Sequence, residues 1–132
     1  MLINEENYVD KAEQTICNLV KKSQEKRRKR GEDNLVTTSK IRNLLSITAD
    51  IYNQILNDTG EQLSDEICER IQYLRVRFVY EAGREEKVRD FVEESKILEI
   101  IQQIQGSRRN YILFSRYMEA LVAFHKYYEK KL

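Results

Sequence analysis

The sequence predicts an all-α fold, a compact bundle of about five to six helices. Three observations support this prediction: the 132 residues include no proline and only four glycines, and apolar residues recur mostly at helical spacing. A chain of this length suits one domain with a modest core. We therefore expect residues 1–132 to form a single helical domain.

The N-terminal part of the chain predicts one helix followed by a basic arm. A helix is expected over about residues 5–22, because apolar residues recur at helical spacing and lysines close the last turn. Residues 22–34 contain almost no apolar side chain and include a block of like charge at Lys26–Arg30. Such a block repels itself and has nothing to bury, so we expect a mobile arm. Its role stays open between an electrostatic arm for phosphates and a solvated linker.

A second helix is predicted to start near residue 38 or 39 and to run to about residue 57. Lys40 and Arg42 lie in its first turns, where a cation opposes the helix dipole at about 0.3–1 kcal/mol when exposed. An anion bound at this end would satisfy the free N–H groups, the dipole and both cations. We therefore predict a phosphate site here. The alternative is that Asp33, Glu32 or another helix neutralises the two cations.

The central helix is predicted over Ser64–Ala82. A strand is the alternative for its second half, because apolar residues nearly alternate from Leu74 to Tyr80, but the residues before them continue one helical face. Arg70, Arg77 and Arg84 are spaced by seven, nearly two turns, so they line one side about 10 Å apart. Pairing with glutamates three or four residues away is the alternative role for each arginine.

The rest of the chain, from Gly83 onward, is predicted to form three more helices. Gly83 is expected to break or bend the central helix at a sharp junction that needs no Cβ. Helices are then expected at about residues 85–94, 97–104 and 109–130. The aromatic residues of the last helix recur at regular spacing, which favours packing in the core over stacking on nucleic-acid bases.

The sequence lacks the residues that several kinds of catalytic and metal-binding site require. No glycine-rich nucleotide loop occurs, and His125 is the only histidine, so a histidine-based triad or metal site is excluded. Cys17 and Cys68 are single, and no apolar run could span a membrane, which favours a reduced, cytoplasmic location without membrane contact. We therefore expect no enzyme activity, no cofactor and no metal. The formal net charge is +1, so any anion-binding surface must come from local segregation of charge.

Three segments carry a resemblance to a known family. They are YLRVRFVYEAGRE at residues 73–85, LVTTSKIRNLL at residues 35–45 and RYMEALVAFHKYY at residues 116–128. In this order along the chain they resemble the small subunit of type III-A (Csm-type) CRISPR effector complexes. Three ordered matches from about residue 35 to the C-terminus are far more specific than one.

The resemblance implies a non-catalytic subunit of a ribonucleoprotein for antiviral defense. In that family, copies of the small subunit stack and support the guide RNA–target RNA duplex through a basic surface. The implied partners are guide RNA, target RNA, the backbone and large subunits, and other copies of the chain. Within the matching segments the candidate phosphate contacts are Lys40, Arg42, Arg75, Arg77, Arg84 and Arg116. The alternative function is a helical protein–protein adaptor without RNA contact, which predicts that Lys40 and Arg42 are paired with acidic side chains.

Overall fold

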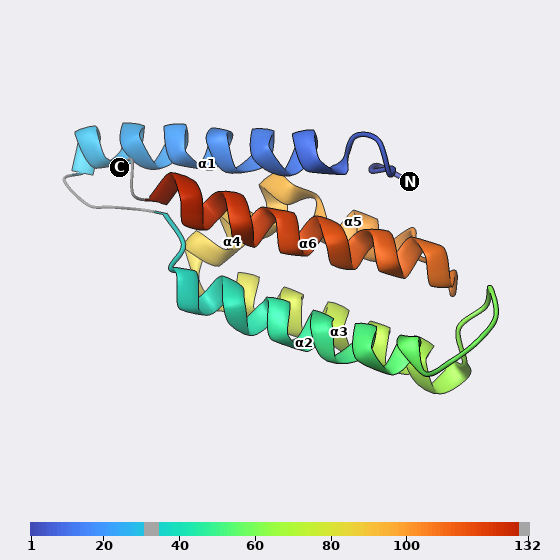
Figure 1. The fold of residues 1–132 in the computed structure, drawn as a ribbon. Coiled ribbons are helices and arrows are strands. Elements are labelled where there is room, and N and C mark those ends of the chain that lie inside the picture. Colours follow the sequence, from blue (N-terminus) through green and yellow to red (C-terminus); the bar gives the residue numbers. More distant parts are fainter. Residues whose placement is uncertain (31–34, 130–132) are drawn as a thin grey trace.

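Six α-helices make up the computed structural model, which describes residues 1–30 and 35–129 (Figure 1). In chain order the helices are α1 (Tyr8–Arg30), α2 (Thr38–Leu56), α3 (Asp65–Arg84), α4 (Glu86–Ser95), α5 (Ile97–Gln102) and α6 (Arg108–Glu129). Within the described ranges the β-structure is limited to one isolated bridge between Gln62 and Ser107. The predicted all-α fold is therefore confirmed.

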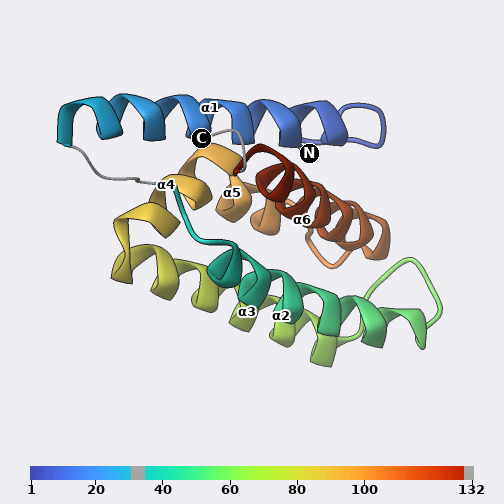
Figure 2. The ribbon, with the colours of Figure 1, turned by 60° about the vertical axis from the view of Figure 1, so that its left-hand side comes forward.

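Helix α6 lies in the middle of the bundle. Figures 1 and 2 show α1 on one side of it and the antiparallel pair of α2 and α3 on the other. α6 packs against α1 and α2, α3 packs against α2 and α4, and α4 returns to contact α1. The N-terminal end of α2 consequently lies beside the C-terminal end of α3.

The aromatic residues of α6 pack in the core, as their spacing predicts. Tyr111, Phe114 and Tyr117 are buried, and the two tyrosine hydroxyls also reach other helices. Tyr111 donates to the carbonyl of Thr48 in α2 at 2.6 Å, and Tyr117 donates to the carbonyl of Ser95 at the end of α4 at 2.8 Å. Burial raises the pKa of both hydroxyls, so they remain donors. α6 thus holds its neighbours by packing and by directed hydrogen bonds.

The central stretch is a helix, and the strand alternative is wrong. Ser64 is the N-cap, and its hydroxyl accepts from the N–H of Ile67 at 3.3 Å. The buried face consists of Ile67, Ile71, Leu74, Phe78 and Ala82, which recur at helical spacing. The helix also continues two residues beyond the predicted end.

The prediction for Gly83 is wrong. This glycine lies inside the last turn of α3, and a Cβ placed on it would meet no atom within 4 Å. The junction is made instead by Glu85, a single residue in extended conformation (φ −137°, ψ 130°) between α3 and α4. An extended residue redirects the chain without a glycine, because any L-residue adopts this conformation.

Helix α1 is longer than predicted and continues to Arg30 through much of the expected arm. The sequence lacks apolar residues there, but α4 offers carboxylates at helical spacing. Lys22 pairs with Glu94 at 2.6 Å, and Lys26 pairs with Asp90 at 3.0 Å and Glu86 at 3.5 Å. The hydrogen bonds to Glu94 and Asp90 raise the pKa values of Lys22 and Lys26 respectively. Residues 31–34 of the predicted arm lie outside the described residues.

His125 fixes the segment that leads into α2. The side chain is 1% exposed, and Nε2 lies 2.7 Å from the carbonyl oxygen of Val36. Nδ1 makes no hydrogen bond with any described residue, and the carboxylate of Glu129 is 3.8 Å away. Burial lowers the pKa of His125, although the contacts with Val36 and Glu129 oppose this shift and Lys126 adds to it. The neutral ring therefore donates from Nε2 and joins α6 to the start of α2.

Tyr111→Phe should lower the free energy of unfolding by about 1–2 kcal/mol, because it leaves the buried carbonyl of Thr48 without its second donor. Urea denaturation followed by circular dichroism would measure this loss. Tyr73→Phe is the matched control, because the Tyr73 side chain is 62% exposed and should tolerate the same change. Equal stability of the two variants would contradict the role given to the Tyr111 hydroxyl.

Stability should fall as the pH drops from about 7.5 to about 5.5. The unfolded chain binds a proton on His125 at the ordinary pKa of about 6.5, whereas the folded chain binds it only at lower pH. The unfolded state therefore holds more protons in this window, and acidification favours it. Urea denaturation at both pH values would measure the effect. His125→Gln, which keeps a donor for Val36, should flatten the pH dependence, and an equally steep dependence in this variant would exclude His125 as its source.

Candidate nucleic-acid interface

A cleft of about 320 Å³ lies between the start of α2 and the end of α3. Three of the six predicted cations line it: Lys40 from α2, and Arg77 and Arg84 from α3. Two carboxylates, Glu81 and Glu85, line the same cleft. The described side chains of the cleft therefore combine three positive and two negative charges.

The antiparallel packing of α2 and α3 brings these residues together. Ile41 and Leu44 are buried on α2, and Phe78 and Ala82 are buried on α3, so both helices turn their inner faces to the core. The residues flanking these faces then meet across the helix pair. Lys40 is one such flanking residue, beside the end of α3.

The start of α2 has the features that predicted an anion site, with one difference. Thr37 is the N-cap but makes no side-chain capping bond, and no acidic residue lies in the first turn. The hydroxyl of Thr38 instead donates to Glu129 of α6 at 2.5 Å. This bond is the main cause that lowers the pKa of Glu129. A carboxylate from another helix therefore already lies near this helix end.

Lys40 is paired, in agreement with the alternative that another helix neutralises it. Its ammonium group binds the carboxylate of Glu85 at the junction of α3 and α4. The two side chains are 41% and 35% exposed, and an ion pair at such a surface is worth about 0.2–1 kcal/mol. Lys40 can thus exchange Glu85 for a phosphate at small cost.

Arg77 and Arg84 share one carboxylate. Glu81 lies 3.6 Å from the guanidinium of Arg77 and 3.9 Å from that of Arg84, both at the limit of an ion pair. The guanidinium carbon of Arg77 also lies 6.0 Å from the ring centre of Tyr80. The predicted pairing within the helix is confirmed for both arginines. Because one carboxylate serves two cations, part of their charge remains available at the surface.

Arg42 and Arg75 do not line this cleft. Arg42 is exposed on α2 and makes no ion pair with any described residue. Arg75 is half-buried on α3, and its helical position lies about 200° from that of Arg77, on the opposite flank. The two residues are therefore unpaired within the described chain but separate from the three cations of the cleft.

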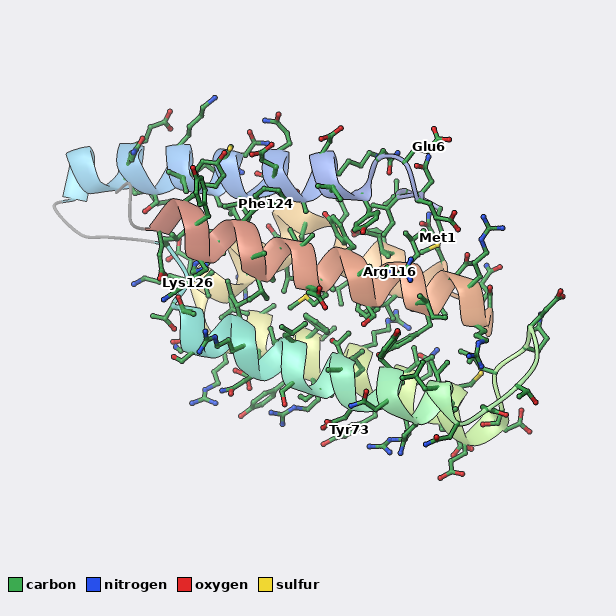
Figure 3. All side chains as sticks on the ribbon, viewed as in Figure 1. Met1, Glu6, Tyr73, Arg116, Phe124 and Lys126 are labelled. Atoms are coloured by element: carbon green, nitrogen blue, oxygen red, sulfur yellow. The ribbon has the colours of Figure 1, made fainter. Side chains whose placement is uncertain are left out.

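Arg116 lies apart from the other five predicted residues. It is exposed on α6 (Figure 3) and lines a second cleft of about 500 Å³, which shares no residue with the first. Arg108 and Arg109 from the start of α6 line this second cleft as well. The six predicted cations therefore do not form one continuous strip, and the structure brings together only Lys40, Arg77 and Arg84.

The arginines at the start of α6 have structural roles that the sequence did not reveal. The guanidinium of Arg108 donates to the carbonyls of Ile55, at 3.0 Å, and Asp58, at the end of α2. Arg109 pairs with Glu5 at 2.8 Å. Arg108 therefore joins the start of α6 to backbone carbonyls at the end of α2. No motif marks such a contact, because its partners are backbone atoms about 50 residues away.

The described residues offer neither a metal site nor a membrane-spanning helix. The described residues contain no group of three or more histidine, cysteine or acidic side chains that could hold a metal ion. None of the described helices is long and apolar enough to cross a membrane.

Comparisons with known proteins agree on one family. A family model described as Csm2 type III-A matches residues 13–131. The chain is 42% identical to the CRISPR system Cms protein Csm2 of Streptococcus thermophilus over 130 residues, which cover 98% of both chains. It is 40% identical to the protein of the same name from Mycobacterium tuberculosis H37Rv over 131 residues, covering 99% of this chain and 98% of the relative. A third relative with this name, from Enterococcus italicus, is 35% identical over 97 residues, 72% of this chain. The chain therefore belongs to the Csm2 family, the small subunit of type III-A CRISPR systems.

Proposed function

We propose that the chain is a non-catalytic subunit that stacks in several copies and supports the guide RNA–target RNA duplex with the cleft between α2 and α3. The observation that carries this proposal is the convergence of Lys40, Arg77 and Arg84 on one solvent-facing cleft. A duplex of this kind is bound through its shape and backbone, so phosphate contacts suffice and base pairing supplies specificity.

The helix end beside the cleft supports the same proposal. The first turn of α2 contributes free N–H groups and the positive end of its dipole, with no acidic residue in that turn. Lys40 extends from this turn into the cleft. A phosphate held there would gain from the dipole, the amides and the ammonium group at once, whereas Glu85 satisfies only the ammonium group and Glu129 binds the hydroxyl of Thr38.

Arg42, Arg75 and Arg116 belong to the proposal in a different way. They do not share the cleft, but they are not bound in ion pairs with described residues and remain open to phosphates elsewhere along a duplex. A duplex that crosses several stacked copies can meet cations on more than one face of each copy. In this arrangement the cleft is the principal contact and the other three are secondary.

The second candidate function is a protein–protein adaptor that does not touch RNA. The observation that favours it is the pairing of Lys40 with Glu85, which such an adaptor predicts. The unpaired side chain of Arg42 opposes it, because the adaptor predicts a partner there as well. The two functions differ in what neutral substitutions in the cleft do to RNA binding.

Lys40→Gln combined with Arg77→Gln should weaken binding of the guide–target duplex by the assembled complex by about tenfold. The slope of log affinity against log salt concentration should fall by about one for each lost phosphate contact. Arg109→Gln is the control, because Arg109 pairs with Glu5 outside the cleft. An unchanged affinity and salt slope in the double variant would favour the adaptor.

Glu85→Gln should have the opposite effect to the double variant and tighten duplex binding several-fold, because it removes the carboxylate that pairs with Lys40. Glu119→Gln on α6 is matched in charge and exposed, but it makes no ion pair with a described residue. Titration of both variants with duplex at one salt concentration would separate the local effect from the change in net charge. Equal gains in the two variants would show that Glu85 does not restrain Lys40.

A further inference from the structure

His125 carries a buried nitrogen that has no hydrogen-bond partner among the described residues. Nε2 lies 2.7 Å from the carbonyl oxygen of Val36 and must donate to it, so Nδ1 of the neutral ring is an acceptor. A carboxylate oxygen of Glu129 lies 3.8 Å from Nδ1. Two acceptors therefore face each other at a side chain that is 1% exposed. A proton on Nδ1 would turn this contact into a hydrogen bond.

The carboxylate of Glu129 lies between His125 and the start of α2. Its Oε2 atom accepts from the hydroxyl of Thr38 at 2.5 Å, and the same atom is the one near Nδ1 of His125. Its Oε1 atom pairs with Lys126 at 3.1 Å. Figures 1 and 2 show this end of α6 beside the segment that leads into α2. A movement of Oε2 by about 1 Å would give the roughly 2.7–2.9 Å of a charged hydrogen bond with His125.

The charges that act on the His125 ring come from its own helix. Burial lowers the pKa of His125 most strongly, the contact with Val36 and the charge of Glu129 raise it, and Lys126 lowers it. Residues 35–39, at the start of α2, include no ionisable side chain. The charged residues of the neighbouring elements are engaged elsewhere: Lys22 and Lys26 of α1 with Glu86, Asp90 and Glu94 of α4, Lys40 of α2 with Glu85, and Glu13 of α1 with Tyr128. Glu129 is therefore the described carboxylate that a protonated His125 would bind.

A protonated ring fits this site, because each of its two nitrogens already has an acceptor nearby. We infer that the carboxylate of Glu129 exchanges between Thr38 and His125, so that a proton on His125 draws it away from the start of α2 and opens this helix end to a phosphate. His125 and Glu129 are then positioning residues, which act on the anion site without touching RNA. The regulation of RNA binding rests on the proposed function, whereas the exchange within the chain does not.

The direction of the coupling follows from the charges. While His125 is neutral, Glu129 and a phosphate repel each other and compete for the hydroxyl of Thr38. The hydrogen bond from Thr38 lowers the pKa of Glu129, so this side chain stays a carboxylate while His125 titrates. Once His125 is protonated, the carboxylate is neutralised and Thr38 is free for the phosphate. A proton therefore tightens phosphate binding, and by linkage a bound phosphate raises the pKa of His125.

Thr38→Val tests the exchange in the full chain without RNA. It removes the hydroxyl that competes for Glu129 and leaves both neighbours of the ring in place, so the pKa of His125 should rise by about 0.5 or more. Glu129→Gln should lower this pKa by a similar amount, because the carboxylate raises it. NMR titration of the ring protons measures both shifts without ambiguity, since His125 is the only histidine.

Thr37→Val is the matched control, because the neighbouring hydroxyl of Thr37 makes no capping bond and should leave the pKa of His125 unchanged. Circular dichroism would verify that each variant is folded. Loss of structure cannot imitate the expected pair of results, because it would raise the pKa in Glu129→Gln as well. An unchanged pKa in Glu129→Gln, or equal pKa values in Thr38→Val and Thr37→Val, would overturn the inference.

The assembled complex tests the consequence for RNA. Binding of the guide–target duplex should be several-fold tighter at about pH 5.5 than at about pH 7.5, and His125→Gln should remove this difference. Groups that titrate in other subunits are common to both complexes, so the comparison isolates His125. If Lys40→Gln with Arg77→Gln weakens binding but His125→Gln keeps the pH dependence, the regulation is wrong and the proposed function stands. If the double variant binds unchanged, the proposed function fails, and the NMR titration still decides the exchange.

Discussion

Burial of the aromatic face of α6 is the constraint on which the rest of the structure depends. Tyr111, Phe114 and Tyr117 need partners on several sides, and α1, α2 and the end of α4 supply them. The hydroxyls of the two tyrosines must then find acceptors, because an unpaired buried hydroxyl would cost about 1–3 kcal/mol. They find them in backbone carbonyls of α2 and α4. These directed hydrogen bonds fix the positions of the neighbouring helices, which apolar contact alone does not.

The position of α2 decides the geometry of the cleft. α6 holds the start of α2 from two points, through His125 to Val36 and through Glu129 to Thr38. Lys40 is thereby held at the end of α3. Its partner there is a carboxylate at a partly exposed surface, where a single ion pair contributes little. The packed helices thus fix where the charged side chains lie. The ion pairs between these side chains are weak, so another anion can replace the carboxylate.

The sequence predicted most helices closely, because their signals are local. The cap at Ser64 and the buried spacing from Ile67 to Phe78 lie within one helix. Apart from the local role predicted for Gly83, the errors concern contacts between distant segments. α1 continues to Arg30 because α4 supplies carboxylates to Lys22 and Lys26, and Glu85 meets Lys40 across 45 residues of sequence. Spacing along one helix cannot reveal such partners. For the same reason three of the six predicted cations share a cleft while Arg42, Arg75 and Arg116 do not.

Arg77 and Arg84 lie at the border between two faces of α3. The flank toward α2 opens into the cleft, and the outer face carries the exposed side chains of Tyr73, Val76 and Tyr80. Within the chain they share Glu81 at long distances, so neither is strongly held. A ligand that presents several negative charges in a row outcompetes one carboxylate, because its charges act together. A duplex backbone, whose phosphates follow one another along each strand, would meet this condition.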